Sequence, residues 1–106
     1  METVEDIKGN LTTFNQTGQS VADHVNNVFS LSISFKPVEL TPPRYYNSFY
    51  KKYVKESKRQ AIASLDDLAG QLERYNLIAP VFLVSWMDWK QINQTLSKIS
   101  DRVNKY

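Results

Sequence analysis

Positively charged side chains are concentrated in residues 51–59 of this chain. Five cations lie there with Glu56 as the one acidic neighbour, namely Lys51, Lys52, Lys55, Lys58 and Arg59. If this stretch is a helix, a rotation of about 100° per residue gathers the cations on one arc and turns the nearby aromatic residues to the other. Those aromatic residues are Tyr45, Tyr46, Phe49, Tyr50 and Tyr53. One face can then pack on a core while the other presents fixed positive charge, an arrangement for binding rather than for catalysis.

The ligand class of this positive face stays open on charge alone. A solvated helix side is the ordinary interpretation of surface cations, but such a side usually mixes both signs of charge. The scarcity of acids among residues 51–59 favours binding instead. Phosphates and acidic peptide loops both accept charge-assisted hydrogen bonds from lysine and arginine. The two hypotheses are therefore an acidic protein segment and a nucleic acid held directly by its phosphates.

A second candidate feature is the pair of tryptophans, Trp86 and Trp89, with Lys90 beside them. They follow the most apolar run of the chain, so packing in the core is the first interpretation. In the alternative interpretation the two rings rim a surface pocket that anchors an apolar side chain of a partner, and Lys90 adds charge. We include all three as candidate partner-binding residues.

Catalytic and metal-binding chemistry finds little support in the sequence. His24 is the only histidine and there is no cysteine, which excludes multi-histidine metal sites, zinc–thiolate sites and thiol nucleophiles. Asp66 and Asp67 are adjacent, so on a helix their carboxylates point about 100° apart and do not converge on one atom. The three glycines are scattered and form no phosphate-binding loop. We expect a protein that is not an enzyme and that needs no metal or cofactor.

Length and composition are those of one ordinary folded domain. The 106 residues are 42% hydrophobic and 23% charged, with a net charge of +2, which is sufficient for a single core. The N-terminus lacks the pattern of a signal peptide. The apolar run of residues 77–86 is about half of the roughly 20 residues that a membrane-spanning helix needs. We therefore expect no membrane association.

The beginning of the chain is predicted to be distinct from the rest. Residues 1–18 are expected to be an N-terminal extension, and an apolar stripe at helical spacing is compatible with a helix there. The stripe consists of Val4, Ile7, Leu11 and Phe14. It could pack on the domain or on a second copy of itself, so a structural oligomer is a third hypothesis.

An alternating pattern predicts one minor β element. The apolar members of residues 31–35 alternate with serines and Pro37 follows, as in a short half-buried strand. Such a strand needs a partner for its backbone groups, and residues 38–40 and 76–78 are the candidates. The predicted fold class is mainly α: a small helical domain with a minor two-stranded β element, in which residues 19–106 form one compact unit.

Capping signals divide the helical part of the domain. Four helix starts are predicted, at Ser20 with Asp23, at Thr41 followed by Pro42 and Pro43, at Ser64 with Asp67, and at Asp88 with Gln91. The helix that starts at Thr41 is expected to end near Arg59, and residues 80–86, apolar on all sides, are expected to form a short central helix. The last helix carries a stripe of Trp89, Ile92, Leu96, Ile99 and Val103.

Four short motifs occur in a fixed order along residues 20–106. They are Ser-Ile-Ser-Phe-Lys-Pro at 32–37, Ser-Leu-Asp-Asp-Leu at 64–68, the apolar run that ends in Trp86, and the closing segment 96–106. In this order they resemble the C-terminal, nucleoprotein-binding domain of rhabdovirus phosphoproteins. The resemblance implies a small, mostly helical domain with a minor β element, in which Trp86 matches a tryptophan that lines a hydrophobic pocket in lyssavirus members.

The resemblance also implies a function. The domain would be a monomeric, non-enzymatic adaptor that binds viral nucleoprotein in complex with RNA, while other parts of the full-length protein bind the viral polymerase. It would act in viral RNA replication and transcription inside the host cell, in cytoplasm or nucleus, and as a virion component. Members hold acidic nucleoprotein loops through a basic patch and nearby hydrophobic residues, which here would be residues 51–59 and Trp86. The alternative is a small basic helical domain that binds nucleic acid directly.

Overall fold

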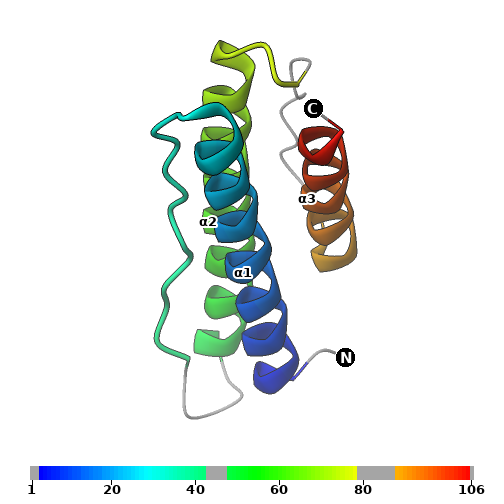
Figure 1. The fold of residues 1–106 in the computed structure, drawn as a ribbon. Helices are drawn as coiled ribbons and strands as arrows, with labels where there is room; N and C mark the ends of the chain where they lie inside the picture. The colour runs from blue at the N-terminus through cyan, green and yellow to red at the C-terminus, as the bar shows by residue number, and fades with distance from the viewer. Residues whose placement is uncertain (1–2, 43–47, 79–87, 106) are drawn as a thin grey trace.

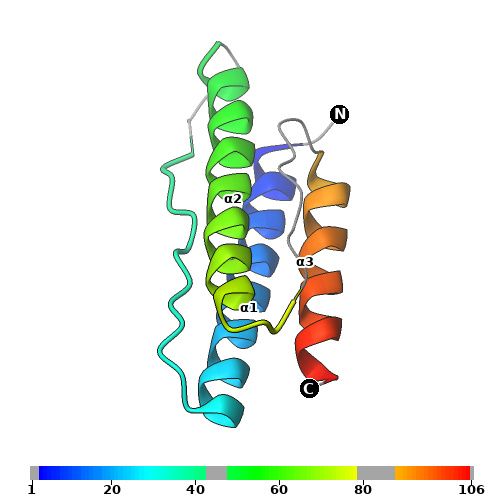
Figure 2. The same ribbon diagram turned by 90° about the horizontal axis from the view of Figure 1, so that it is seen from above.

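Three long α-helices make up the structure, a computed structural model that describes residues 3–42, 48–78 and 88–105. They are α1, Val4–Phe29; α2, Ser48–Arg74; and α3, Trp89–Asn104. All three helices run in the same direction, and every pair is in contact (Figure 1 and Figure 2). The molecule is elongated along the helix axes, with extents of 45 × 23 × 17 Å.

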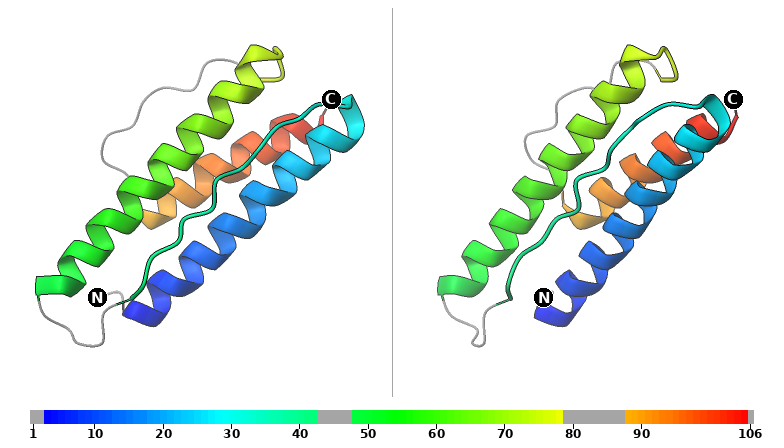
Figure 3. Two further views of the ribbon diagram at one scale, coloured as in Figure 1. Left: turned by 90° about the vertical axis from the view of Figure 1, so that its left-hand side faces the viewer. Right: turned by 60° about the vertical axis from the view of Figure 1, so that its left-hand side comes forward.

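Residues 30–42 form an extended segment, the strap, which returns from the end of α1 along one side of the α1–α2 pair (Figure 3). Parallel neighbours require such a return, because the end of α1 and the start of α2 lie at opposite ends of the bundle. An extended chain of this length spans about 43 Å, and the 26 residues of α1 rise about 39 Å. The strap is therefore long enough to bring the chain back along the whole of α1.

The predicted two-stranded β element is wrong, because the described residues contain three helices and no strand. The alternation that predicted a strand does produce extended chain, with Ile33 and Phe35 buried on its inner side. However, neither candidate partner pairs with it: residues 38–40 belong to the strap itself, and residues 76–78 form the turn after α2. The fold is a small all-helical domain.

Side-chain amides take the place of a neighbouring strand. Each of three amides donates to the carbonyl oxygen and accepts from the N–H of a single strap residue, and we name these pairs the amide clamps. They are Asn26 with Ile33 (2.8 and 2.6 Å), Gln71 with Ser34 (2.7 and 3.1 Å) and Asn15 with Val38 (3.0 and 2.8 Å). Successive residues of an extended chain direct their backbone groups to opposite sides. The backbone of Ile33 therefore bonds to a side chain of α1, and the backbone of Ser34 bonds to a side chain of α2. The strap lies edge-on between the two helices.

α1 is one uninterrupted helix that passes through the predicted boundary at residue 18. Its N-cap is Thr3, whose hydroxyl accepts from the Asp6 N–H at 3.1 Å while the Asp6 carboxylate accepts from the Thr3 N–H at 2.9 Å. The predicted helix start at Ser20 is wrong, because Asp23 instead accepts a hydrogen bond from a glutamine one turn earlier in the same helix. The apolar stripe of the predicted extension packs in the common core with the other two helices.

α2 joins two helices that the sequence predicts as separate. It begins at Ser48, so Thr41 and Pro42 belong to the strap and the predicted start there is wrong; residues 43–47 lie outside the described residues. The predicted break before Ser64 is also wrong, because a buried stripe keeps its helical period across that position. The stripe consists of Ala61, Leu65, Leu68 and Leu72.

α3 begins where the capping signal predicts. Asp88 is the N-cap, and its side chain accepts from the Gln91 N–H at 2.8 Å. The five predicted stripe residues are all buried in the core. The predicted short helix over residues 80–86 lies outside the described residues.

The strap packs directly against the backbone of α1 at Gly18. The Phe35 ring lies over Gly18, where an added Cβ atom would be 2.2–2.6 Å from three ring atoms. The same ring contacts Phe14 one turn earlier, with 5.6 Å between the ring centroids. A glycine inside a helix normally weakens it. Here the missing side chain provides the space that the ring occupies.

Candidate functional site

The cations of residues 51–59 lie along the outer side of the N-terminal half of α2, and one further cation, Arg74, is in its last turn. Lys51, Lys52 and Lys55 are exposed, and Lys58 is partly buried. No carboxylate of the described residues forms an ion pair with Lys51, Lys55 or Lys58. We name Lys51, Lys52, Lys55 and Lys58 the lysine face. Their helical arrangement agrees with the arc predicted from their spacing.

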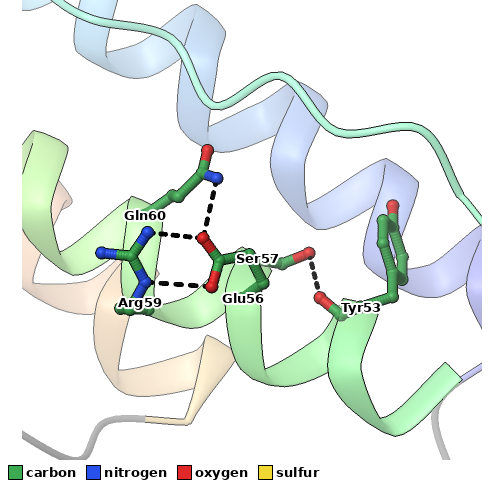
Figure 4. Close-up of polar contacts among 5 residues, drawn as sticks. All are labelled: Tyr53, Glu56, Ser57, Arg59 and Gln60. Carbon is green, nitrogen blue, oxygen red and sulfur yellow. Dashed lines mark hydrogen bonds and ion pairs between the residues drawn. The ribbon is translucent and has the colours of Figure 1, made fainter. Parts of the chain in front are cut away.

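Arg59 was predicted as a member of this face, but its charge is engaged within the chain. Its guanidinium forms a two-point ion pair with Glu56, including a hydrogen bond of 3.0 Å between Nε and Oε2 (Figure 4). Gln60 donates a further hydrogen bond to the same carboxylate at 3.1 Å. The three-residue spacing of opposite charges on a helix is a sequence signal for such a pair. Arg59 is therefore less available to a partner than the lysines.

The Glu56 carboxylate should titrate far below its ordinary range. Hydrogen bonds from Arg59 and Gln60 lower the pKa of Glu56 from 4.5 to about 2. Because the folded-state pKa is the lower one, the interaction stabilises the fold above about pH 4.5 and is lost as the pH falls toward about 2. Arg59→Ala should return the Glu56 pKa toward its ordinary value, as measured by NMR titration of the side-chain carboxyl carbon. A pKa that stays near about 2 in this variant would assign the shift to another group.

Aromatic residues fix the opposite side of α2 to the core. Tyr53 is buried, and Tyr50 is partly buried against the core cluster. Burial raises the pKa of the Tyr53 hydroxyl, as expected for a phenol in apolar surroundings. Tyr45, Tyr46 and the side chain of Phe49 lie outside the described part of the chain. The helix that carries the lysine face is thus fixed to the core by its opposite side.

Acidic residues limit the length of the lysine face. From Lys51 to Lys58 the face extends about 10 Å along the helix axis. Farther along α2, Asp66 and Glu73 fall within about 20° of the direction of Lys55. The side of α2 that carries the lysines in its first half therefore carries these two carboxylates beyond it, so a ligand that follows the helix meets both signs of charge.

The lysine face begins at the end of α2 where a helix favours cations least. The first turn of α2 has no acidic residue and includes Lys51, whereas the first turn of α1 has Glu5 and Asp6 and α3 has the Asp88 cap. A helix N-terminus carries about half a positive charge, so a lysine there is unfavourable by roughly 0.3–1 kcal/mol. Fold stability gives no reason for this placement.

The tryptophan pocket receives no support from the described residues. Trp89 is 2% exposed and packs in the core as the first residue of α3, so its ring cannot line a surface pocket. Its Nε1–H and the Oδ1 of Asn93 one turn later are buried without a hydrogen-bond partner in the part of the chain that the structure describes. Lys90 is exposed on α3, a different helix from the one that carries the lysine face. Trp86 lies outside the described residues.

No arrangement for binding a metal ion appears in residues 3–42, 48–78 and 88–105. They contain no group of three or more His, Asp or Glu side chains placed to hold a metal ion. His24 is partly buried on α1, and Asp66 and Asp67 lie in the middle of α2 rather than at a helix start. Within the same ranges, no helix has the length and apolar character needed to cross a membrane.

Comparisons of the chain with protein-family models, curated proteins and solved structures find no match. The fold and the lysine face are therefore the features of the molecule from which a function can be inferred. The motif resemblance adds a hypothesis about the partner.

Proposed function

We propose that this domain is a non-enzymatic binding module that captures an acidic, flexible segment of a protein partner on the lysine face. In line with the motif resemblance, the proposed partner is viral nucleoprotein in complex with RNA, to which the domain attaches the viral polymerase complex. The observation that carries the proposal is the row of Lys51, Lys55 and Lys58, which has no carboxylate partner among the described residues.

The spacing of this row suits a carboxylate-rich chain. Lys51, Lys55 and Lys58 are one helical turn apart, which is about 5–6 Å between neighbours. In an extended peptide, side chains on the same side recur every ~6.6 Å, so alternate acidic residues come close to successive lysines. Each exposed pair contributes roughly 0.2–1 kcal/mol. The complex is therefore weak, sensitive to salt and quick to exchange.

Direct binding of nucleic acid is the second candidate, because phosphates also attract lysine side chains. Two observations weigh against it. A phosphate backbone that continues along α2 beyond the lysine face meets the carboxylates of Asp66 and Glu73. Arg59, whose side chain is best suited to two-point phosphate binding, is already paired with Glu56. A short acidic peptide segment avoids both difficulties.

Charge reversal on the lysine face tests the proposal. Lys51→Glu/Lys55→Glu should weaken binding to an Asp/Glu-rich peptide and to purified nucleoprotein–RNA rings by at least about tenfold, because two attractions become two repulsions. Fluorescence anisotropy measures the peptide and surface plasmon resonance the rings, each at low and at physiological salt. The wild-type affinity should fall as salt rises.

Matched controls separate the lysine face from net charge and from nucleic acid. Lys98→Glu/Lys105→Glu makes the same change in net charge on two exposed residues, one in α3 and one at its C-cap, and should bind like the wild type. Circular dichroism verifies that both variants are folded. Equal binding by the wild type and the α2 variant would remove the lysine face from the proposal. Tight binding of bare RNA, lost in the α2 variant, would favour the second candidate.

A further inference from the structure

We propose that this chain forms a dimer with a second copy of itself by exchanging α1, with Ser30 as the hinge. In the exchanged dimer, α1 of each copy packs against the strap, α2 and α3 of the other copy. The closed monomer is the form at low concentration. The dimer forms when the chain folds at high concentration, where a second copy competes with the intramolecular contacts.

Ser30 holds a backbone conformation that serine rarely adopts. Its φ and ψ are 55° and 45°, in the left-handed region that is disfavoured for residues other than glycine and asparagine. Its side chain forms no hydrogen bond with the described residues that would compensate. If Ser30 becomes extended or helical, α1 moves away from the strap and this strain is relieved.

The end of α2 shows how the same chain closes a left-handed turn securely. Asn76 has a φ of 59°, and asparagine tolerates this region well. The Leu77 N–H then donates to the Leu72 carbonyl oxygen at 3.1 Å, which locks the turn to the helix. At the end of α1, no hydrogen bond joins Leu31 to the helix among the described residues. Ser30 thus has a disfavoured backbone conformation, and no hydrogen bond like the one that follows Asn76 stabilises its turn among the described residues.

The contacts that α1 makes with the rest of the chain can all re-form between two copies. The amide clamps of Asn15 and Asn26, together with the contact between the Phe14 and Phe35 rings, join α1 to the strap. α1 also packs on α2 and α3. Because exchange replaces each contact by an identical one across chains, these contributions cancel. The conformation of Ser30 then decides the balance between monomer and dimer.

A further feature favours a second copy as the partner. Val28, close to the hinge, is 50% exposed, and the two hinges of an exchanged dimer lie near each other, where such a side chain becomes covered.

Refolding at two concentrations tests the exchange. Intramolecular contacts have effective concentrations in the millimolar range, so the chain is unfolded in urea, refolded at roughly 10 μM and roughly 1 mM, and sized by sedimentation velocity. Dimer is expected at the higher concentration. Ser30→Gly removes the strain from the monomer and should raise the dimer dissociation constant about fivefold per hinge, or roughly 25-fold in all. Ser30→Ala and Asn76→Gly should stay within about twofold of the wild type.

Isotope mixing identifies the exchanged contacts directly. Copies labelled with ¹³C are refolded together with unlabelled copies at the higher concentration, and an interchain nuclear Overhauser effect between the Phe14 and Phe35 rings is expected. Three results would each overturn the proposal: a dimer without this interchain contact, a wild-type chain that stays monomeric at the higher concentration, or a Ser30→Gly variant that dimerises as tightly as the wild type.

Discussion

Gly18→Ala should lower the midpoint of thermal unfolding by roughly 10–20 °C. The new methyl group would be 2.2–2.6 Å from three atoms of the Phe35 ring, so the ring must leave its place on α1. Overpacking costs about 1–3 kcal/mol, and exposure of a buried aromatic ring adds roughly 2 kcal/mol. The higher helix propensity of alanine returns only about 1 kcal/mol. The net loss is therefore about 2–4 kcal/mol, measured by differential scanning calorimetry.

The other two glycines provide the control for this prediction. An added Cβ at Gly9 or Gly70 meets no atom within 4 Å, and both residues are inside helices. Gly9→Ala and Gly70→Ala should therefore stabilise the fold by about 0.5–1 kcal/mol each. The three substitutions are chemically identical, so a difference in sign reports the environment of Gly18.

A second substitution tests the proposed cause. Phe35→Leu removes the ring atoms nearest to position 18, so adding it to Gly18→Ala should recover part of the lost stability. If Gly18→Ala raises the unfolding midpoint as the control variants do, the Phe35 ring has room to move and the close contact is not a constraint on the fold.

Local signals in the sequence predicted those parts of the fold whose partners are near in the chain. The capping pair of Asp88 and Gln91 marks the start of α3, and its stripe marks the buried side, because both depend only on neighbouring residues and the helical period. The helical period alone also predicts that the four lysines lie on one side of α2. The pairing of Arg59 with Glu56 also has a local signal, because opposite charges three residues apart on a helix are neighbours.

The strap could not be predicted in this way, because distant residues decide what an extended segment pairs with. Alternating side chains in residues 31–35 indicate extended chain and burial on one side. They do not indicate whether another strand or a set of amides satisfies the backbone. Asn26 and Gln71 supply those amides from two different helices, and polar residues on a helix surface carry no signal for that role. Burial of Trp89, in contrast, agrees with its first interpretation as a core residue.

The false helix starts have a related cause. Ser20 with Asp23 and Ser64 with Asp67 have the spacing of a cap, but the same spacing is common inside helices, where the polar side chains bond to neighbouring turns. Continuity of the apolar stripe was the stronger signal, since it spans several turns. It runs through both positions in the structure.

Asn26→Ala should destabilise the fold by about 2–4 kcal/mol, because it leaves the N–H and the carbonyl oxygen of Ile33 without partners at a buried position. Urea denaturation followed by circular dichroism measures the change. The neighbouring residue Asn27 is exposed, so Asn27→Ala should stay within about 0.5 kcal/mol of the wild type. Asn26→Asp keeps the acceptor for the Ile33 N–H and loses the donor to its carbonyl oxygen, so an intermediate loss is expected. A cost below about 0.5 kcal/mol for Asn26→Ala would mean that water replaces the amide and that the clamp adds little.

Combining two clamp variants tests whether the strap detaches as one unit. If Asn26→Ala alone releases most of the strap from α1, the clamp at Asn15 is already weakened, and adding Asn15→Ala should cost less than it does in the wild type. Equal costs in both backgrounds would instead make the clamps independent local contacts. If the strap detaches as one unit, dimer formation is affected. α1 can be exchanged only when the clamps of Asn15 and Asn26 and the Phe35 contact open together. Clamp variants should then speed up exchange between copies, while the hinge residue Ser30 sets its equilibrium.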